Sequence, residues 1–217
     1  MTQTLLIILS SVAAITYGAV LVVAPVSPLR TGVKMMAVGA LALLAWFSGP
    51  HNLVGMMLCV ALGLSAVGDG FLAGDAKRWL GLGLASFLIA HGLYVAAFWS
   101  LGAHGHLVSP ARLALIGACV AGGAIMLAWL WPHLGAMRAA VSIYVAAIVA
   151  MLATSLLLPW QAWPVMVGAV AFMASDAILS AELFRKARLG NSERLSAYAV
   201  WALYYAGQAA ITYGLLR

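Results

Sequence analysis

Long apolar stretches, separated by short polar segments, make up almost the whole chain. The apolar runs are continuous and rich in Ala, Leu and Gly, as in Leu41–Ala45 and Leu80–Ala90. A membrane-spanning β-strand would alternate apolar and polar residues, whereas a spanning helix needs about 20 consecutive, mostly apolar residues. The pattern therefore predicts an all-α polytopic membrane protein.

The apolar pattern divides into about eight transmembrane helices. The predicted spans cover residues 4–24, 31–48, 52–73, 79–101, 110–131, 138–157, 162–184 and 194–216. Pro25 and Pro28 are expected to end the first span, and Gly49-Pro50 the second. The first span lacks the charged leading segment of a signal peptide, so it is expected to be a retained helix. Eight spans nearly exhaust the chain, which predicts a single transmembrane helical domain over residues 1–217.

The composition of the chain indicates that most of the protein's surface faces lipid. Hydrophobic residues make up 65% of the chain and charged residues 7%, with a mean hydropathy of +1.08. A soluble domain carries about a quarter charged residues. The chain has too few polar residues to cover a water-exposed surface.

The basic residues test the predicted number of spans. If the loops of eight spans alternate sides, nine of the eleven basic residues fall on one side. These are Arg30, Lys34, Lys77, Arg78, Arg138, Arg185, Lys186, Arg188 and Arg194, which leaves Arg112 and Arg217 on the other side. Such an excess marks cytoplasmic loops, so both termini are expected to face away from the cytoplasm. The same reading explains the net charge of +6 without a nucleic-acid partner. Minimal loops and a high Ala-Gly content favour a bacterial inner membrane.

A weak similarity between two segments of the sequence is consistent with an internal duplication. Gly68-Asp69-Gly70 in the third span and Ser175-Asp176-Ala177 in the seventh both read small–Asp–small and precede an apolar residue and Leu. Because they lie four spans apart, a repeat would be parallel. This similarity predicts a possible four-plus-four pseudo-repeat, in which the last four spans repeat the first four.

Carboxyl groups at membrane depth are the most informative residues of so apolar a chain. Each costs at least ~2.5 kcal/mol to place there. Asp75, Glu182 and Glu193 lie at or near predicted loops, but Asp69 and Asp176 lie inside spans, both in the cytoplasmic half. Two carboxyls in one low-dielectric cavity cannot both ionise cheaply, so one is expected to hold a proton beside an ionised partner. The pair is therefore a candidate for acid and base catalysis, although each acid could instead only pair with a polar group between helices.

Other polar residues lie at similar depth. His91 and Tyr94 share a face of the fourth span, and Tyr205 and Gln208 share a face of the eighth. Such residues are candidates for positioning water or substrate, or for simple interhelical hydrogen bonds. Two further candidates, Lys34 at the start of the second span and Tyr144 in the sixth, could meet a head group or serve as anchors. His51, His104, His106 and His133 lie in predicted loops and receive no role.

Several common catalytic motifs are absent from the sequence. It contains no HExxH, GxSxG, Walker-type loop or CxxC, and Cys59 and Cys119 have no nearby Cys or His partner. The pattern therefore favours chemistry by Asp, His, Tyr and water, with no metal and no cofactor.

Four motifs, in order along the chain, resemble the YhhN-like lysoplasmalogenase family of membrane proteins. They are Gly68-Asp69, Phe87-x-x-x-His91-x-x-Tyr94, Ser175-Asp176 and Tyr205-x-x-Gln208. The resemblance runs from Lys34 onward, and Tyr144 matches a tyrosine of the family's sixth helix. Where the family commonly has Lys-Pro at the start of the second helix, this chain has Lys34-Met35.

The resemblance implies hydrolysis of the vinyl-ether bond of a lysoplasmalogen to a fatty aldehyde and a glycerophospho-alcohol. Asp69 and Asp176 would then act as acid and base, in either order, and His91 would act with them. Lys34, Tyr94, Tyr144, Ser175, Tyr205 and Gln208 would bind the lysophospholipid substrate or position water. A cavity open to the cytoplasmic leaflet could admit such a membrane lipid.

Two other functions fit the same residues. Buried acids and Gly-rich helices are also typical of a small proton-coupled transporter. A membrane scaffold or lipid-binding protein is the third possibility, in which neither aspartate would be needed. Release of an aldehyde product distinguishes the hydrolase from both.

Overall fold

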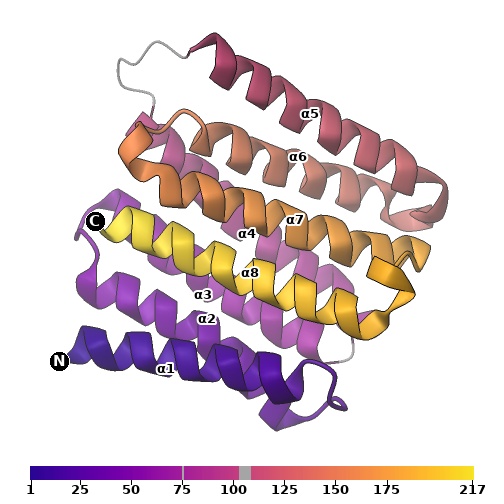
Figure 1. The fold of residues 1–217 in the computed structure, drawn as a ribbon, viewed down its shortest axis with the longest axis horizontal. Coiled ribbons are helices and arrows are strands. Elements are labelled where there is room, and N and C mark those ends of the chain that lie inside the picture. The colour runs from indigo at the N-terminus through magenta and orange to yellow at the C-terminus, as the bar shows by residue number, and fades with distance from the viewer. Residues whose placement is uncertain (75, 103–108) are drawn as a thin grey trace.

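Eight long helices form the described part of the chain. The computed structural model describes residues 1–74, 76–102 and 109–217, and no strand occurs within them. The helices are α1 (Thr2–Thr16), α2 (Pro28–Ser48), α3 (Leu53–Ala73), α4 (Ala76–Gly102), α5 (Pro110–Leu130), α6 (Arg138–Ser155), α7 (Trp163–Arg185) and α8 (Glu193–Leu216). Asp75, His104 and His106, which the sequence assigns to loops, lie outside the described residues. The predicted all-α bundle is confirmed (Figure 1).

Seven of these helices are long and apolar enough to cross a membrane, so the chain is an integral membrane protein. The exception is α8, which packs along α7 and carries polar side chains that the bundle buries. These buried polar residues are Ser196, Tyr204, Gln208 and Thr212. Both termini lie at the same end of the bundle (Figure 1).

The boundaries differ from the prediction mainly around α1 and α2. Pro28 does not end the first helix but begins the second, where it occupies the first turn after Ser27. The Ser27 hydroxyl accepts a hydrogen bond from the Arg30 backbone N–H, and proline is favoured at this position because its missing N–H would have no partner. The first helix ends earlier than predicted, in a π-helical turn over Tyr17–Leu21. Such turns are frequent at functional sites.

Glycines allow α7 and α8 to approach closely. A Cβ on Gly207 would lie 2.8 Å from the Gly168 carbonyl oxygen, and one on Gly168 would lie 2.7 Å from the Gly207 oxygen. Neither contact can be relieved by rotating a side chain, because both atoms belong to backbones. Small residues at this crossing are therefore required by the packing.

Gly207→Ala is expected to destabilise the protein by about 1–3 kcal/mol or more, because the added methyl group overpacks a backbone contact. The measurement is the thermal unfolding midpoint in detergent. Gly63→Ala is the matched control, since a Cβ there would meet no atom within 4 Å. Equal midpoints for the two variants would contradict the close α7–α8 contact.

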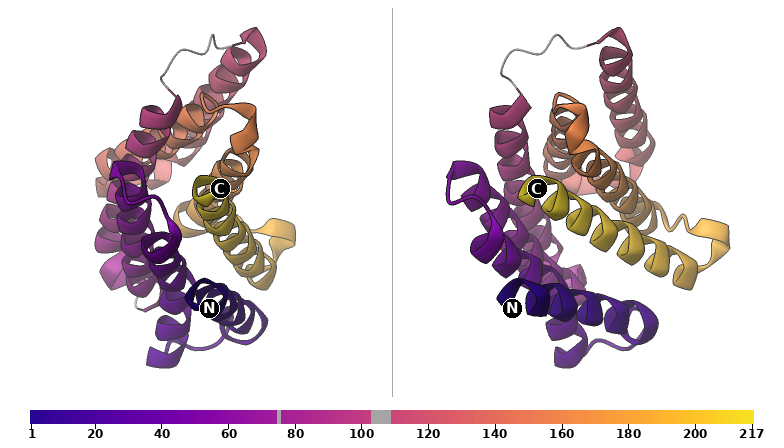
Figure 2. Two further views of the ribbon diagram at one scale, coloured as in Figure 1. Left: turned by 90° about the vertical axis from the view of Figure 1, so that its left-hand side faces the viewer. Right: turned by 60° about the vertical axis from the view of Figure 1, so that its left-hand side comes forward.

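The helices do not pack equally tightly. α7 contacts α8 far more extensively than it contacts α6, and α5 contacts mainly α6. Only Gly123 and Leu130 of α5 are buried, and Figure 2 shows α5 on the outside of the bundle. This uneven packing leaves an internal space, bordered by α5, α6 and α7, that joins the candidate site.

Candidate active site

A cavity of about 460 Å³ occupies one half of the bundle. It lies toward the end where α1, α3, α5 and α7 finish, because its lining includes Leu72 near the end of α3 and Val141 near the start of α6. Both Asp69 and Asp176 line it. Its volume lies in the range of small-molecule sites.

Asp69 is buried, with 1% of its side chain exposed, and has two partners. The Lys34 ammonium lies 3.0 Å from its Oδ1, and the Tyr204 hydroxyl donates to its Oδ2 at 2.7 Å. A cation and a hydrogen-bond donor on one carboxyl both favour the ionised form. Asp69 is thus arranged as a carboxylate.

The glycines beside Asp69 give the small–Asp–small pattern a physical reason. A Cβ on Gly68 would lie 2.7 Å from the Phe87 ring of α4, and one on Gly70 would lie 2.7 Å from the Met35 sulfur of α2. These glycines therefore let α2 and α4 approach α3 on both sides of Asp69. The close approach positions Lys34 of α2 against the carboxylate.

Three aromatic rings surround the Lys34 ammonium. Its nitrogen lies 5.9 Å from the ring centres of Tyr17 and Trp201 and 6.0 Å from that of Tyr204. Cations are attracted to ring faces at such distances. The π-helical turn at the end of α1 contributes Tyr17, so this local irregularity helps to build the lysine's surroundings.

Asp176 has a different environment on the same cavity. The Tyr144 hydroxyl donates to its Oδ2 at 2.6 Å, and no basic side chain of the described residues bonds to it. It remains within electrostatic range of Asp69 and Lys34. The neighbouring Ser175 donates to the Val200 carbonyl at 2.9 Å, which ties this turn of α7 to α8. The two aspartates are therefore unequal, one paired with a cation and the other not.

His91 is fully buried and does not line the cavity. Its Nδ1 lies 2.6 Å from the Phe87 carbonyl, which can only accept, so Nδ1 carries the proton. Its Nε2 is buried and has no partner among the described residues. The ring forms T-shaped contacts with Tyr144 and Phe172, with centroids 5.2 and 4.8 Å away. His91 therefore contacts the tyrosine that holds Asp176.

The other predicted positions divide between the cavity and the layer behind it. Lys34, Asp69, Tyr144, Ser175 and Asp176 line the cavity. Tyr94 and Gln208 are fully buried, and the Tyr94 hydroxyl donates to Gln208 Oε1 at 2.6 Å. Tyr205 instead lies 2.8 Å from the Ser10 hydroxyl of α1. The structure thus places Tyr204, not Tyr205, beside Asp69. Tyr205 and Gln208 bond to different helices, Tyr205 to α1 and Gln208 to α4.

A second, more polar cavity of about 590 Å³ adjoins the first near the basic end of the bundle. The two share Val22, Arg30, Glu182 and Ala197. Arg188 bridges Glu182 and Glu193 at 3.1 and 3.0 Å. Arg194 also lines this cavity and has no ion pair within the described ranges. We call this second cavity the mouth of the site.

Sequence reasoning missed Tyr17, Arg30, Trp201 and Tyr204 as cavity residues. Arg30 donates to the carbonyls of Leu21, Val22 and Ala73, so it closes the ends of two helices as well as lining the mouth. A lone basic residue at the start of a helix is also typical of residues that only orient the helix in the membrane, so the sequence did not mark Arg30 as a cavity residue. No group of three or more His, Cys, Asp or Glu side chains able to hold a metal occurs in residues 1–74, 76–102 and 109–217.

Comparisons with known proteins identify the family of the chain. A model described as the YhhN family matches residues 29–215. Proteins named "Lysoplasmalogenase" from Mycobacterium bovis and Mycobacterium tuberculosis are each 40% identical over an alignment of 167 residues, and the match covers 72% of this chain and 59% of each relative. The chain therefore spans about three fifths of the length of these curated relatives, and no solved structure matches it significantly. Because the family model matches nearly the whole chain, the chain belongs to the YhhN family.

Proposed function

We propose that this protein hydrolyses the vinyl-ether bond of a lysoplasmalogen within the membrane. The observation that carries the proposal is the unequal pair of aspartates on one cavity, Asp69 with a lysine partner and Asp176 without one. The name of the mycobacterial relatives supports the same substrate class. The integral membrane location suits a substrate that is itself a single-chain membrane lipid.

The first step needs a proton donor. Asp176 gives its proton to the vinyl carbon farther from the ether oxygen, and the double bond's electron pair forms the new C–H bond. The carbon bonded to oxygen becomes an oxocarbenium ion, which the two carboxylates of the cavity stabilise. Asp176 is the donor because no cation holds it ionised, whereas Lys34 keeps Asp69 as a carboxylate.

The second step needs a base. Water adds to the oxocarbenium carbon while Asp69 takes one of its protons, giving a hemiacetal. Asp69 then returns this proton to the glycerol oxygen as its bond to carbon breaks. The hemiacetal hydroxyl gives its own proton to Asp176 and becomes the aldehyde. One water is consumed, and both aspartates regain their starting states.

His91 and Tyr144 have supporting roles in this scheme. Tyr144 occupies one oxygen of Asp176, which leaves the other for the substrate. His91 packs against the Tyr144 ring and so acts as a positioning residue.

The mouth suits the polar head of the lipid. Arg30 precedes Lys34 by four residues, slightly more than one helical turn and a rise of about 6 Å. A phosphate near Arg30 and Arg194 would therefore leave the glycerol to reach inward and place the vinyl ether beside Asp69. Lys34, which the sequence made one candidate for the head group, instead pairs with Asp69, so the proposed phosphate contacts are two arginines.

Arg194→Gln is expected to raise KM for a phosphoethanolamine lysolipid about twofold to fivefold, because an exposed charge contact contributes up to ~1 kcal/mol. KM for an alkenyl glycerol without phosphate should stay unchanged. Lys186→Gln is the control, since Lys186 belongs to the same loop but lines neither cavity. If both variants raise KM equally, the effect comes from the general surface charge, which would contradict a head-group role for Arg194.

The basic end of the bundle is assigned to the cytoplasmic face of a bacterial inner membrane, with both termini on the opposite side. The site would then open toward the cytoplasmic leaflet.

The proposed activity is tested with purified protein and matched alkenyl, alkyl and acyl lysolipids. Aldehyde should form from the alkenyl lipid alone. Cleavage of the acyl lipid alone, or lipid accumulation across vesicles without product, would contradict vinyl-ether hydrolysis.

A further inference from the structure

We infer that the hydrocarbon chain of the lipid lies between α5 and α6, where Gly122 leaves room for it. The inference rests on the proposed function, which places the reacting bond at the aspartates. It adds a binding site for the chain and a residue that limits what the site accepts.

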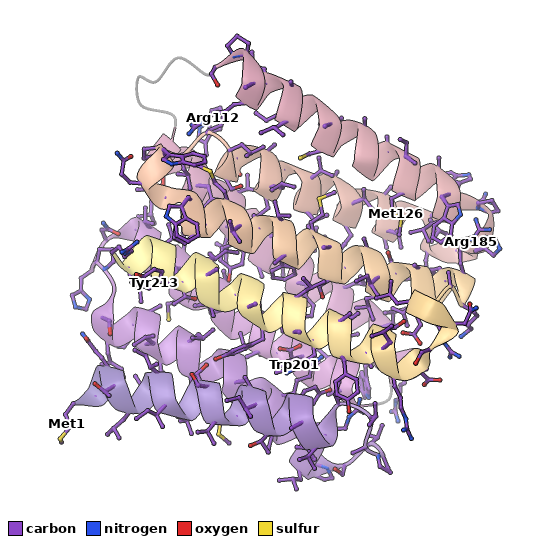
Figure 3. All side chains as sticks on the ribbon, viewed as in Figure 1. Met1, Arg112, Met126, Arg185, Trp201 and Tyr213 are labelled. Atoms are coloured by element: carbon purple, nitrogen blue, oxygen red, sulfur yellow. The ribbon has the colours of Figure 1, made fainter. Side chains whose placement is uncertain are left out.

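The cavity extends well beyond the aspartates into an apolar region. From α5 it is lined by Gly122, Met126 and Leu130, and from α6 by Val141, Val145 and Val149. Figure 3 places Met126 between α5 and the neighbouring helices, whereas Trp201, at the polar part, lies between α8 and α1. We call the region lined by these α5 and α6 residues the chain arm. Its lining has no charged side chain, so hydrocarbon is the ligand class that it suits.

Two adjacent glycines of α5 serve different purposes. A Cβ on Gly123 would lie 2.5 Å from Val149, so Gly123 is required where α5 touches α6. A Cβ on Gly122 would meet no atom within 4 Å, although Gly122 lines the cavity. Helix packing therefore does not explain a glycine at 122. Because Gly122 lines the cavity, a bulky side chain at this position can reach into the chain arm.

The chain arm also borders the lipid bilayer. Gly122 is exposed as well as cavity-lining, and α5 is the least buried of the seven helices that can span the membrane. A single-chain lipid could therefore enter sideways, with its chain moving from bilayer to chain arm without crossing water. Such a path avoids the loss of about 0.8 kcal/mol per exposed methylene.

The test compares Gly122→Phe with Gly117→Phe. Gly117 lies on the same helix, also has no atom within 4 Å of a Cβ, and does not line the cavity. The full-length proteins are placed in nanodiscs, and binding of hexadecyl and octyl alkyl-ether lysolipids is measured together with turnover of the matching alkenyl lipids. Thermal unfolding of both variants shows whether each is folded.

Gly122→Phe should weaken binding of the hexadecyl lipid at least about tenfold, since the ring displaces about two methylenes, and should spare the octyl lipid. Gly117→Phe should match the wild type for both lipids. Unchanged hexadecyl binding by a folded Gly122→Phe, or equal losses for both chain lengths, would overturn the inference. Failure of the proposed function would look different: wild-type protein would bind the lipids and release no aldehyde.

Discussion

Replacing Asp176 with asparagine is expected to lower kcat for a vinyl-ether lysolipid by about 10²–10⁴-fold, the usual contribution of a positioned acid or base. The amide keeps the size of the side chain and can still accept the Tyr144 hydrogen bond. It cannot give a proton to carbon, so the first chemical step loses its donor. The measurement is aldehyde release under saturating substrate.

Two comparisons separate this effect from damage to the fold. Asp176→Glu retains a carboxyl group and should recover part of the activity, while Asp176→Asn should unfold at nearly the same temperature as the wild type. Asp69→Asn should also lose turnover, because the carboxylate that accepts the water proton is gone. Near-normal turnover by Asp176→Asn would remove it from the chemistry and favour a scaffold or carrier.

Lys34→Met is expected to destabilise the protein by about 3–5 kcal/mol, the typical cost of removing one partner from a buried ion pair. Asp69 has 1% of its side chain exposed and would keep only the Tyr204 hydroxyl as a partner. An uncompensated carboxylate at membrane depth is the physical cause. The measurement is the unfolding free energy or midpoint in detergent.

The double variant Lys34→Met/Asp69→Asn provides the control. With both charges removed, most of the lost stability should return, because a neutral amide needs no buried cation. Activity should not return with it. If the double variant is as unstable as Lys34→Met, the loss comes from packing around Tyr17 and Trp201 instead of from the ion pair.

The sequence was sufficient to predict the helices and the positions of the two acids along them. Continuous apolar runs of this length form helices in lipid, so the composition and the length of the runs were enough to predict a helical bundle. The error at Pro28 arose because a proline ends one helix and begins another with the same local signal. Gly68 and Gly70 could be recognised as small, but their contacts with Phe87 and Met35 depend on the packing of three helices.

The side-chain partners could not be predicted in the same way. Tyr204 and Tyr205 are adjacent, so a rotation of about 100° around the helix decides which of them meets Asp69. From the sequence, Lys34 was a candidate for a head-group contact or for a membrane anchor, whereas the structure pairs it with Asp69. No local sequence pattern indicates that α1 packs against α8, so the contacts of Tyr17 and Ser10 with α8 could not be predicted. The parallel repeat of α1–α4 and α5–α8 stays a prediction.

Hydrolysis in heavy water tests most directly the central chemical step, the protonation of the vinyl carbon by an exchangeable acid such as the Asp176 carboxyl. The aldehyde is reduced as it forms, and its mass spectrum locates any deuterium. One deuterium is expected on the carbon next to the carbonyl carbon, and none when preformed aldehyde is incubated with the protein for the same time. Aldehyde formed without deuterium at that carbon would contradict proton transfer from Asp176.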